Sequence, residues 1–408
     1  MALIPIDEAL GLLMEGVVPL PAEAVPVADA AGRFLSEAVT SPVAFPFENN
    51  SAMDGYALRA DQGPWRVIGE SAAGKPFGGR LGDNEAIRIF TGAVVPEGAD
   101  TVLMQENAKR DGDLLQATQG PELGRHIRHA GSDIEVGQPL LDAGQRLRPL
   151  DTGAMAGLGY GTLPCHRRPR VIVFSTGDEL RPAGTELASG QIYESNGVQL
   201  AATAAAAGAE VIARYHLPDQ RAVIDEALAD AVKRADVVLL SGGVSVGDHD
   251  HVGAALDALC GGLEFHKVRM KPGKPVAAGR CGDCTLIGLP GNPASAAVAF
   301  ELFARPVLRT LLGDRRPHRR VLVRTAGADL KASGPRAEFQ RGRWSGGTIT
   351  GTKRQGSGDL SSLTGVNAFI VRPPNSEPVK AGEPVFCMPL FGRGDANPPE
   401  AQWAALES

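Results

Sequence analysis

The sequence predicts a multidomain α/β protein built around a central, doubly wound, three-layer α/β domain. Short continuous apolar runs at 171–174 and 237–240 are typical of strands buried on both faces of a parallel sheet. Each run ends in a turn of small residues, at 175–179 and 241–243. Between residues 170 and 309 such runs alternate with helical patterns, which is the order of a doubly wound sheet.

Length and composition limit the class of protein. A chain of 408 residues is too long for one ordinary core, so two to four domains are expected. A net charge of -6 without a basic block argues against a nucleic-acid partner. No apolar run reaches membrane-span length, and the N-terminus lacks the pattern of a signal peptide, so we expect no membrane association and a cytoplasmic protein. The spacing of Cys281 and Cys284 predicts a turn between strands, because no second pair completes a zinc site.

The N-terminal part is expected to combine helices with short strands. Apolar spacing predicts an amphipathic helix over 4–18 with Asp7 as its cap. Short apolar runs between glycine turns predict a β-rich module over 65–133. A second helix over about 148–158 is expected to open at Pro149.

The central and C-terminal parts differ in pattern. The helices expected in the central part are 196–208, 221–234 with Asp219 as its cap, 252–259 and 294–312. Its further strands are expected at 210–215, 265–270 and 275–278. From 320 to 388 short strands without a clear helix predict a small C-terminal β-barrel.

These patterns predict a division into domains. The expected segments are an elongated N-terminal domain (1–41 with 134–168), a β-rich second domain (42–133), the α/β domain (169–316), the barrel (317–394) and a tail (395–408).

Two strand-end turns in one domain suggest a shared site. In open α/β sheets ligands bind beyond the carboxyl ends of the strands. Small residues with free N–H groups suit an oxyanion, and the carboxylates of Asp248 and Asp250 suit Mg²⁺. A helix beginning at Pro293 is expected to direct its N-terminus at the same edge. The basic cluster at 125–134 would act as a clamp beside an anionic ligand.

Seven motifs occur in the order and spacing of one family. PFENNSAMDGYA, IRIFTGAVVPEGAD, STGDEL, QIYESN, SGGVSVGDHD, MKPGKP and LPGNPAS resemble the molybdopterin molybdenumtransferase family, which includes the bacterial enzyme and the E domain of gephyrin. The resemblance extends from about residue 4 to 390. It implies a transferase that inserts molybdate into adenylylated molybdopterin, releases AMP and uses Mg²⁺. It also implies an elongated homodimer whose cleft lies between the α/β domain of one subunit and the second domain of the other.

The resemblance also implies roles for single residues. The pterin-phosphate and nucleotide site would comprise Ser175, Thr176, Gly177, Asp178, Glu179, Ser241, Gly242, Gly243, Pro290, Asn292 and Pro293. The acidic positions for metal binding or catalysis would be Asp54, Glu179, Asp219 and Asp250, with Asp133 as a further candidate; we assign the metal to Glu179 and Asp250. Thr91 and Arg128 would come from the other subunit. Lys267, Lys271 and Lys274 would face the anion, with Lys271 and Lys274 taking part in catalysis, and Arg341 and Ser357 would come from the C-terminal domain. The histidines beside Asp250 and the sequence RHIRHAGSD depart from the commonest family pattern.

Three other functions compete with this one. The adenylyltransferase that makes the substrate shares the α/β domain, but it is usually that domain alone. A scaffold like gephyrin would carry a further domain and a long linker. A generic sugar-phosphate-binding protein would not explain PFENNSAMDGYA. Other cofactor-synthesis proteins are candidate partners.

Overall fold

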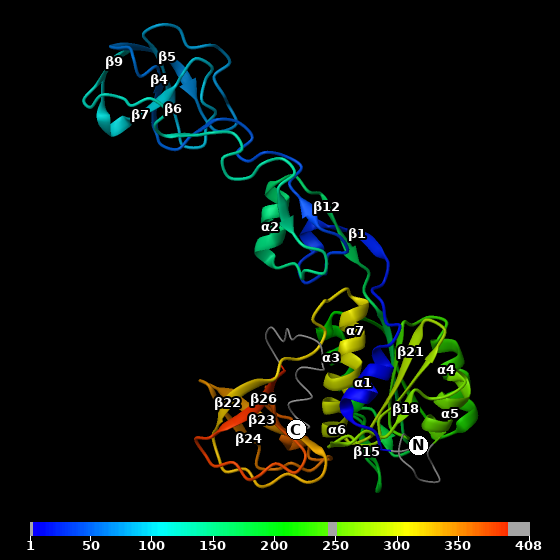
Figure 1. Cartoon of the computed structure of the whole chain (residues 1–408). Helices are drawn as coiled ribbons and strands as arrows, with labels where there is room; N and C mark the ends of the chain where they lie inside the picture. Colours follow the sequence, from blue (N-terminus) through cyan, green and yellow to red (C-terminus); the bar gives the residue numbers. More distant parts are fainter. Residues whose placement is uncertain (1–2, 244–250, 391–408) are drawn as a thin grey trace.

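The computed structural model describes residues 3–243 and 251–390. The molecule is elongated, with a β-rich module at one end and a narrow middle part around α2 (Pro149–Gly157) and β12 (Thr162–His166) (Figure 1). The α/β part and a β-barrel lie side by side at the other end. Asp250 and Asp248 lie outside the described residues.

The central sheet has the strand order β16-β13-β17-β21-β20-β18. Its strands are β13 (Arg170–Thr176), β16 (Glu210–Leu217), β17 (Val237–Ser241), β18 (Phe265–His266), β20 (Ala277–Cys281) and β21 (Cys284–Leu289). The strands from β16 to β21 are parallel, whereas β20 and β18 add to the edge antiparallel. The expected parallel sheet is therefore a mixed one. The predicted turn at Cys281 and Cys284 is confirmed, because these residues are paired at the turn of the β20–β21 hairpin.

Helices cover both faces of this sheet, which confirms the three-layer prediction. Alternate residues of β13 face opposite cores: Val171 and Val173 pack with one helical layer, Ile172 and Phe174 with the other. The first layer contains α1 (Ile6–Met14), α3 (Asn196–Ala207), α6 (Pro293–Ala299) and α7 (Arg305–Leu311). The second contains α4 (Arg221–Ala231) and α5 (His251–Cys260).

Some details of the helices differ from expectation. The N-cap of α1 is Pro5 rather than Asp7, and the N-cap of α4 is Gln220 rather than Asp219. The helix expected over 294–312 is interrupted between α6 and α7 by a π-helical turn at Phe300–Ala304. Pro306 follows that turn and lacks the backbone N–H that an α-helical hydrogen bond needs. The helix is locally wider at this point.

The β-rich module is built on a sheet of order β7-β4-β6-β5-β9-β8. Its strands are β4 (Gly55–Leu58), β5 (Trp65–Ser71), β6 (Glu85–Ile89), β7 (Thr101–Met104), β8 (Ala108–Asp111) and β9 (Leu114–Ala117). Beside it β3 (Asn50–Ser51) pairs with β10 (Ile127–Arg128). In the middle part β1 (Ala22–Pro26) pairs with β12, and β2 (Val39–Thr40) pairs with β11 (Pro139–Leu141).

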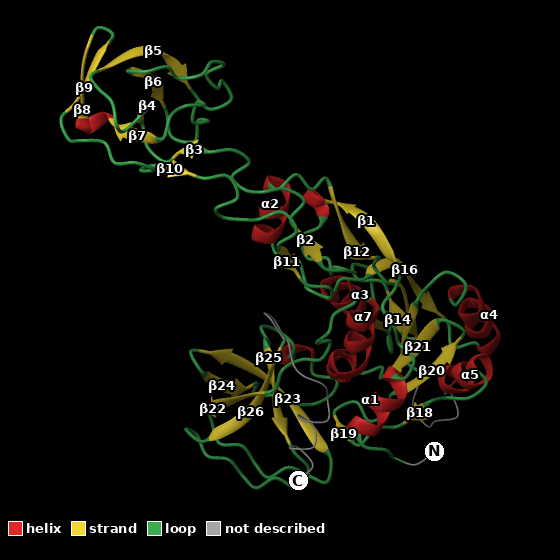
Figure 2. Ribbon diagram, turned by 45° about the horizontal axis from the view of Figure 1, so that its top comes forward, coloured by secondary structure: helices red, strands yellow, loops and turns green. Residues whose placement is uncertain are grey.

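The C-terminal part is a closed barrel, as predicted. Its strands are β22 (Leu322–Ala326), β23 (Ala337–Ser345), β24 (Thr348–Gly351), β25 (Ala368–Arg372) and β26 (Pro384–Pro389). Pairing of β23 with β25 closes the circle. Another strand, β19 (Met270–Lys271), leaves the α/β part and pairs with β23. This pairing fixes the barrel next to the α/β domain (Figure 2).

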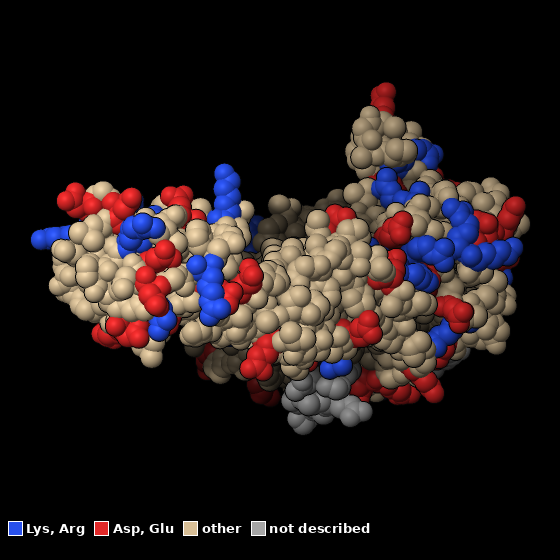
Figure 3. Space-filling model, turned by 90° about the horizontal axis from the view of Figure 1, so that it is seen from above, with Lys and Arg blue, Asp and Glu red and all other residues tan. Residues whose placement is uncertain are grey.

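Within the described residues, no helix combines the length and apolar character needed to cross a membrane. On the face shown in Figure 3, basic and acidic side chains are interspersed at both ends of the molecule.

Candidate functional site

The carboxyl ends of β13, β17 and β21 bring the predicted turns to one edge of the sheet. Ser175 is in register with Ser241, and Ser241 is in register with Leu289. The turns that follow these strands begin at Gly177, Gly242 and Pro290, and they therefore lie next to one another. This edge, with the start of α6, is the candidate site.

A buried asparagine connects two of these turns. Asn196, at the start of α3, donates from Nδ2 to Ser241 Oγ at 2.8 Å and to the carbonyl of Gly291 at 2.6 Å. Ser241 Oγ in turn donates to the carbonyl of Pro290 at 3.2 Å. The two turns are thus held together by the side chains of Asn196 and Ser241 and the backbone carbonyls of Pro290 and Gly291.

Gly242 allows the turns to pack closely. Its φ is +104°, and a Cβ atom there would lie 2.6 Å from the carbonyl oxygen of Thr176. Only glycine fits both the backbone conformation and the space. Glycine at this position therefore lets the turns after β13 and β17 lie in direct contact.

Among the described residues, two buried polar atoms at this edge lack a hydrogen-bond partner. They are Thr176 Oγ1 and Asn196 Oδ1, on side chains of residues that are 5% and 8% exposed. An unsatisfied buried polar atom costs about 1–3 kcal/mol. Such atoms are usually satisfied by water or by a ligand, so this edge has the character of a binding site.

Acidic residues adjoin the first turn. The N–H of Asp178 donates to Asp219 Oδ2 at 3.4 Å, and the N–H of Asp219 donates to Asp178 Oδ1 at 3.2 Å. Asp219 is thus held by the turn rather than by α4. The carboxylate of Glu179 folds back over Gly177, where an added Cβ would lie 2.6 Å from Glu179 Oε2. In the described part of the chain these acids do not form a ready cluster of three metal ligands.

The predicted lysines lie beside α6. A Cβ on Gly273 would be 3.4 Å from the carbonyl oxygen of Ser295, which places the loop of Lys271 and Lys274 against the first turn of this helix. Lys271 Nζ pairs with Glu338 of the barrel at 3.0 Å. Burial opposes ionisation of Glu338, but hydrogen bonds, first that from Lys271, outweigh it, so the pKa of Glu338 lies below its ordinary value.

The other two lysines have different surroundings. Lys274 lines an open cavity of about 530 Å³ with Leu3, Arg269, Pro335 and Arg336. Lys267 has a φ of +75°, and its backbone N–H donates to the carbonyl of Val276.

The barrel contributes a loop that docks on the start of α6. Asn292 Nδ2 donates to Ser357 Oγ at 3.0 Å, and the N–H of Ala294 donates to the carbonyl of Ser357 at 3.1 Å. Arg341 is 1% exposed, and it donates to the carbonyl of Gly356 at 2.8 Å and to Ser362 Oγ at 3.1 Å. Arg341 therefore supports the loop of Ser357 from inside the barrel, and contact with a ligand remains a prediction.

The remaining predicted residues lie in the β-rich module. Asp54 Oδ1 accepts hydrogen bonds from Thr91 N–H at 2.7 Å and Thr91 Oγ1 at 2.8 Å. These bonds, the backbone one first, lower the pKa of Asp54. Arg128 lies on β10, opposite Asn50 of β3. Within one chain this group is separated from the sheet edge by the middle part of the molecule (Figure 1).

Comparison with known proteins agrees with this arrangement. Models of the MoeA N-terminal region (domains I and II), of a probable molybdopterin binding domain and of the MoeA C-terminal region (domain IV) match residues 4–159, 172–310 and 324–390. The chain is 36% identical over 403 residues to a molybdopterin molybdenumtransferase of Haemophilus influenzae, covering 95% of this chain and 99% of that one. It belongs to the molybdopterin molybdenumtransferase family.

Other relatives of this transferase family cover the whole chain. The molybdopterin molybdenumtransferase of Bacillus subtilis is 32% identical over 423 residues, covering 99% of this chain and 97% of that one. A crystal structure of a molybdopterin biosynthesis MoeA protein from Pyrococcus horikoshii superimposes with a TM-score of 0.85 at 29% identity, covering 96% of this chain and all of that one. The multidomain α/β fold is therefore that of the molybdenumtransferase family.

The motifs of the molybdenumtransferase family contain one residue whose role sequence reasoning missed. Asn196 ends the motif QIYESN, and the sequence indicated only that a helix begins there. Its position before a helix and within a motif was the available signal. Its two hydrogen bonds to the turns of β17 and β21 could not be seen without the fold.

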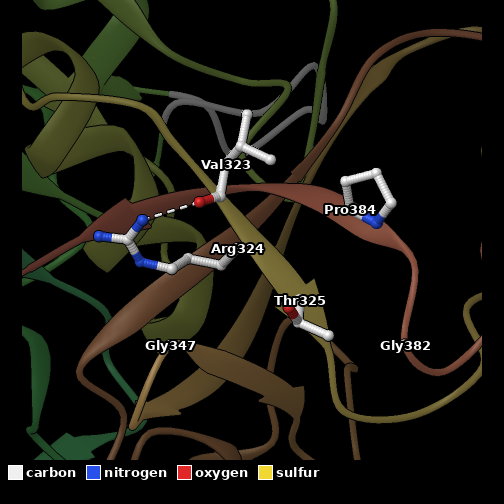
Figure 4. Close-up of a pocket in the computed structure, with 6 residues that line it drawn as sticks. All are labelled: Val323, Arg324, Thr325, Gly347, Gly382 and Pro384. Atoms are coloured by element: carbon white, nitrogen blue, oxygen red, sulfur yellow. Dashed lines mark hydrogen bonds between the residues drawn. The ribbon is translucent and has the colours of Figure 1, made fainter.

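A further cavity lies away from these residues, on the barrel. It has a volume of about 270 Å³ and is lined by Val323, Arg324, Thr325, Gly347, Gly382 and Pro384 (Figure 4). The Arg324 guanidinium turns back to donate to the carbonyl of Val323 at 2.7 Å. None of these six lining residues belongs to the motifs of the molybdenumtransferase family.

Proposed function

We propose that this protein inserts molybdate into adenylylated molybdopterin, releases AMP and depends on Mg²⁺. The observation that carries the proposal is the sheet edge where three turns converge around the unpartnered atoms Thr176 Oγ1 and Asn196 Oδ1. Membership of a family named for molybdenum transfer to molybdopterin gives the substrate class.

The sheet edge would bind the phosphates and nucleotide of the substrate. Neutral donors suit this task, and the Thr176 hydroxyl at this edge has no hydrogen-bond partner among the described residues. Lys271 and Lys274, beside α6, add positive charge for phosphate and molybdate oxygens. Ser357 extends the site from the barrel side.

Glu179 and Asp250 would hold Mg²⁺. Carboxylate oxygens are the ligands that this ion prefers, and the carboxylates of Asp178 and Asp219 beside Glu179 make the turn suitable for a hard cation. When bound, the ion would stabilise the negative charge of the anhydride oxygens. The residues of the chain would orient the anhydride.

In the proposed reaction an oxygen of molybdate, or of water, attacks the adenylyl phosphorus. The new P–O bond places that oxygen on AMP, and the phosphoanhydride bond breaks with its bridging oxygen left on the terminal phosphate of molybdopterin. Molybdenum forms two Mo–S bonds with the dithiolene sulfurs, and the two thiol protons leave with one molybdate oxygen as water. Where a molybdate oxygen has attacked phosphorus, the Mo–O bond to AMP breaks. The lysines and the Thr176 hydroxyl would stabilise the charge that develops on phosphate oxygens.

The active unit would be a homodimer. Asp54, Thr91 and Arg128 lie far from the sheet edge of their own chain, so they would complete the site of a second copy. We also propose a cytoplasmic location, the division into domains given above and other cofactor-synthesis proteins as partners.

The test is a valine substitution that removes one unpartnered hydroxyl. We expect Thr176→Val to lower kcat/KM for molybdate-dependent AMP release by about tenfold to a hundredfold, because a hydrogen bond to a charged group contributes about 1.5–3 kcal/mol. Folding stability should not fall, because the hydroxyl has no partner in the protein. The assay is AMP release from adenylylated molybdopterin with and without molybdate.

Thr310→Val is the matched control. Thr310 Oγ1 is also buried without a partner, but it lies on α7, away from the sheet edge. AMP release by this variant should equal that of the wild type. Absence of molybdate-dependent AMP release in the wild type would refute the proposed function, and equal activity of the two valine variants would remove Thr176 from the site.

A further inference from the structure

Arg88, on β6 of the β-rich module, makes hydrogen bonds on both sides of Asp54. Its Nη1 donates to the carbonyl of Gly55 at 2.8 Å, and its Nη2 donates to Gln105 Oε1 at 2.7 Å. The N–H of Gln105 in turn donates to the carbonyl of Asp54 at 3.2 Å. The Arg88 guanidinium thus connects Gly55, which follows Asp54, with Gln105, whose N–H donates to the Asp54 carbonyl.

Aromatic rings fix the orientation of this guanidinium. Its carbon atom lies 4.7 Å from the ring centre of Phe90 and 5.2 Å from that of Tyr56. A cation over an aromatic face is held by about 0.5–1 kcal/mol at an exposed site. With both Nη atoms engaged by the protein, the fork of Arg88 is directed at the backbone around Asp54 rather than outward.

The backbone at Gly55, which accepts a hydrogen bond from Arg88, is closely packed. Gly55 begins β4, which packs so closely on β7 that a Cβ there would lie 2.0 Å from the carbonyl oxygen of Leu103. Thr91, which donates twice to the Asp54 carboxylate, follows Arg88 by three residues, in the turn after β6. Arg88 therefore connects the main chain of Asp54 with the turn that holds its side chain.

We infer that Arg88 is a positioning residue for the Asp54 carboxylate. It orients Asp54 and Thr91 as one unit toward the substrate held by another subunit, without touching that substrate itself. The expected effect on the reaction rate rests on the proposed function. The contacts between Arg88, Asp54 and Thr91 concern the β-rich module alone.

The first test is Arg88→Lys, which keeps the charge but loses the planar fork. We expect kcat for AMP release to fall by about tenfold to a hundredfold, since small misplacement of a catalytic group has effects of that size. KM should stay within about twofold, because Arg88 does not bind substrate. Arg110→Lys is the control. Arg110 lies on β8 of the same sheet, and it contacts Gly112 and Asp113 of its own turn.

The second test asks whether Arg88 acts through Asp54. In an Asp54→Asn background, Arg88→Lys should cause little further loss of kcat, because the group that it positions is already inactive. The inference would be overturned if Arg88→Lys lowered kcat in the Asp54→Asn background as much as in the wild type. It would also be overturned if Arg88→Lys alone raised KM and left kcat unchanged.

Hydrogen exchange of the Thr91 amide gives a readout that needs no substrate. This N–H donates to Asp54, so Arg88→Lys should speed its exchange while Arg110→Lys should not. Unchanged exchange in Arg88→Lys would contradict the inference. If wild-type protein releases no AMP, the proposed function is wrong, and the exchange result alone decides the role of Arg88.

Discussion

His318 lies among buried charged side chains between α7 and the barrel. Arg309 and Asp314 form an ion pair at 2.6 Å, with both side chains 8% exposed. Burial, followed by the nearby Arg319 cation, lowers the pKa of Arg305 to about 9. Burial, followed by the charge of Arg305, lowers the pKa of His318 to about 4. This histidine is therefore neutral in the folded protein near pH 7.

The neutral His318 predicts a loss of stability in acid. Its folded pKa of about 4 lies below the ordinary value of 6.5, so between these values the unfolded chain binds the proton first. Above pH 6.5 His318 contributes no pH dependence, and as pH falls from 6.5 to 4 it should remove about 3 kcal/mol of the free energy of unfolding. Urea unfolding of wild type and His318→Gln at pH 7.5 and 4.5 checks this.

The variant should lose less stability than the wild type between these two pH values. His129→Gln, at an exposed position, is the control and should behave as the wild type. Equal pH dependence in His318→Gln and the wild type would show that His318 takes up its proton without a folding penalty.

At the scale of elements, local sequence patterns correctly predicted the strands in which almost every residue is buried. Residues 171–174 and 237–240 were correctly predicted as strands, because a strand covered by helices on both faces must be apolar throughout. The helix ending at Gly208 was also correct, since glycine there adopts φ +106° as a left-handed cap.

Pairings between distant segments could not be predicted in this way. Met270 was expected to end a strand over 265–270 of the α/β domain, but Met270 and Lys271 pair with the barrel strand β23. Aspartate is a common helix cap, yet the carboxylate of Asp219 accepts a hydrogen bond from the N–H of Asp178, in a turn 41 residues away. Local preferences are overridden wherever a tertiary partner offers a better hydrogen bond.

The candidate site shows the same division. The turns at 175–179 and 241–243 were predicted to share an edge because the carboxyl ends of parallel strands meet, and the structure brings them together. The burial of Arg341 was not predictable, because the sequence around it does not show that this arginine faces the interior of a barrel. Several roles assigned by resemblance, including those of Asp250 and Lys267, remain predictions.

Arg341 predicts how the barrel loop is held. Arg341→Met should speed hydrogen exchange in residues 355–359 and lower the free energy of unfolding by about 2–3 kcal/mol, because bonds from a buried charged group to Gly356 and Ser362 are lost. Exchange monitored by mass spectrometry, with thermal unfolding, measures both effects.

Arg343→Met is the matched control on the same strand. Arg343 is exposed and donates to the carbonyl of Thr364, so its loss should change stability by about 0.5 kcal/mol or less. If the two variants showed the same exchange in 355–359, Arg341 would not be the support of this loop.

At the scale of the whole molecule, the elongated shape determines how a site can be assembled. The middle part is attached firmly to the α/β domain: the Arg309 guanidinium lies 4.4 Å from the ring centre of Phe34, and the N–H of Leu20 donates to the carbonyl of Leu311 at 2.8 Å. This attachment holds the β-rich module away from the sheet edge of the same chain (Figure 1). In the proposed function Asp54 would therefore serve that edge in a second copy.

Subunit complementation tests this shared site most directly. Asp54→Asn inactivates the β-rich module, and Asp219→Asn inactivates the sheet edge, so each variant alone should release little AMP. After subunit exchange, a mixture of equal amounts should regain about a quarter of wild-type activity, because half of the dimers are mixed and each mixed dimer has one intact site of two. If subunits exchange and the mixture stays as inactive as the separate variants, the two groups of residues do not form one site across subunits.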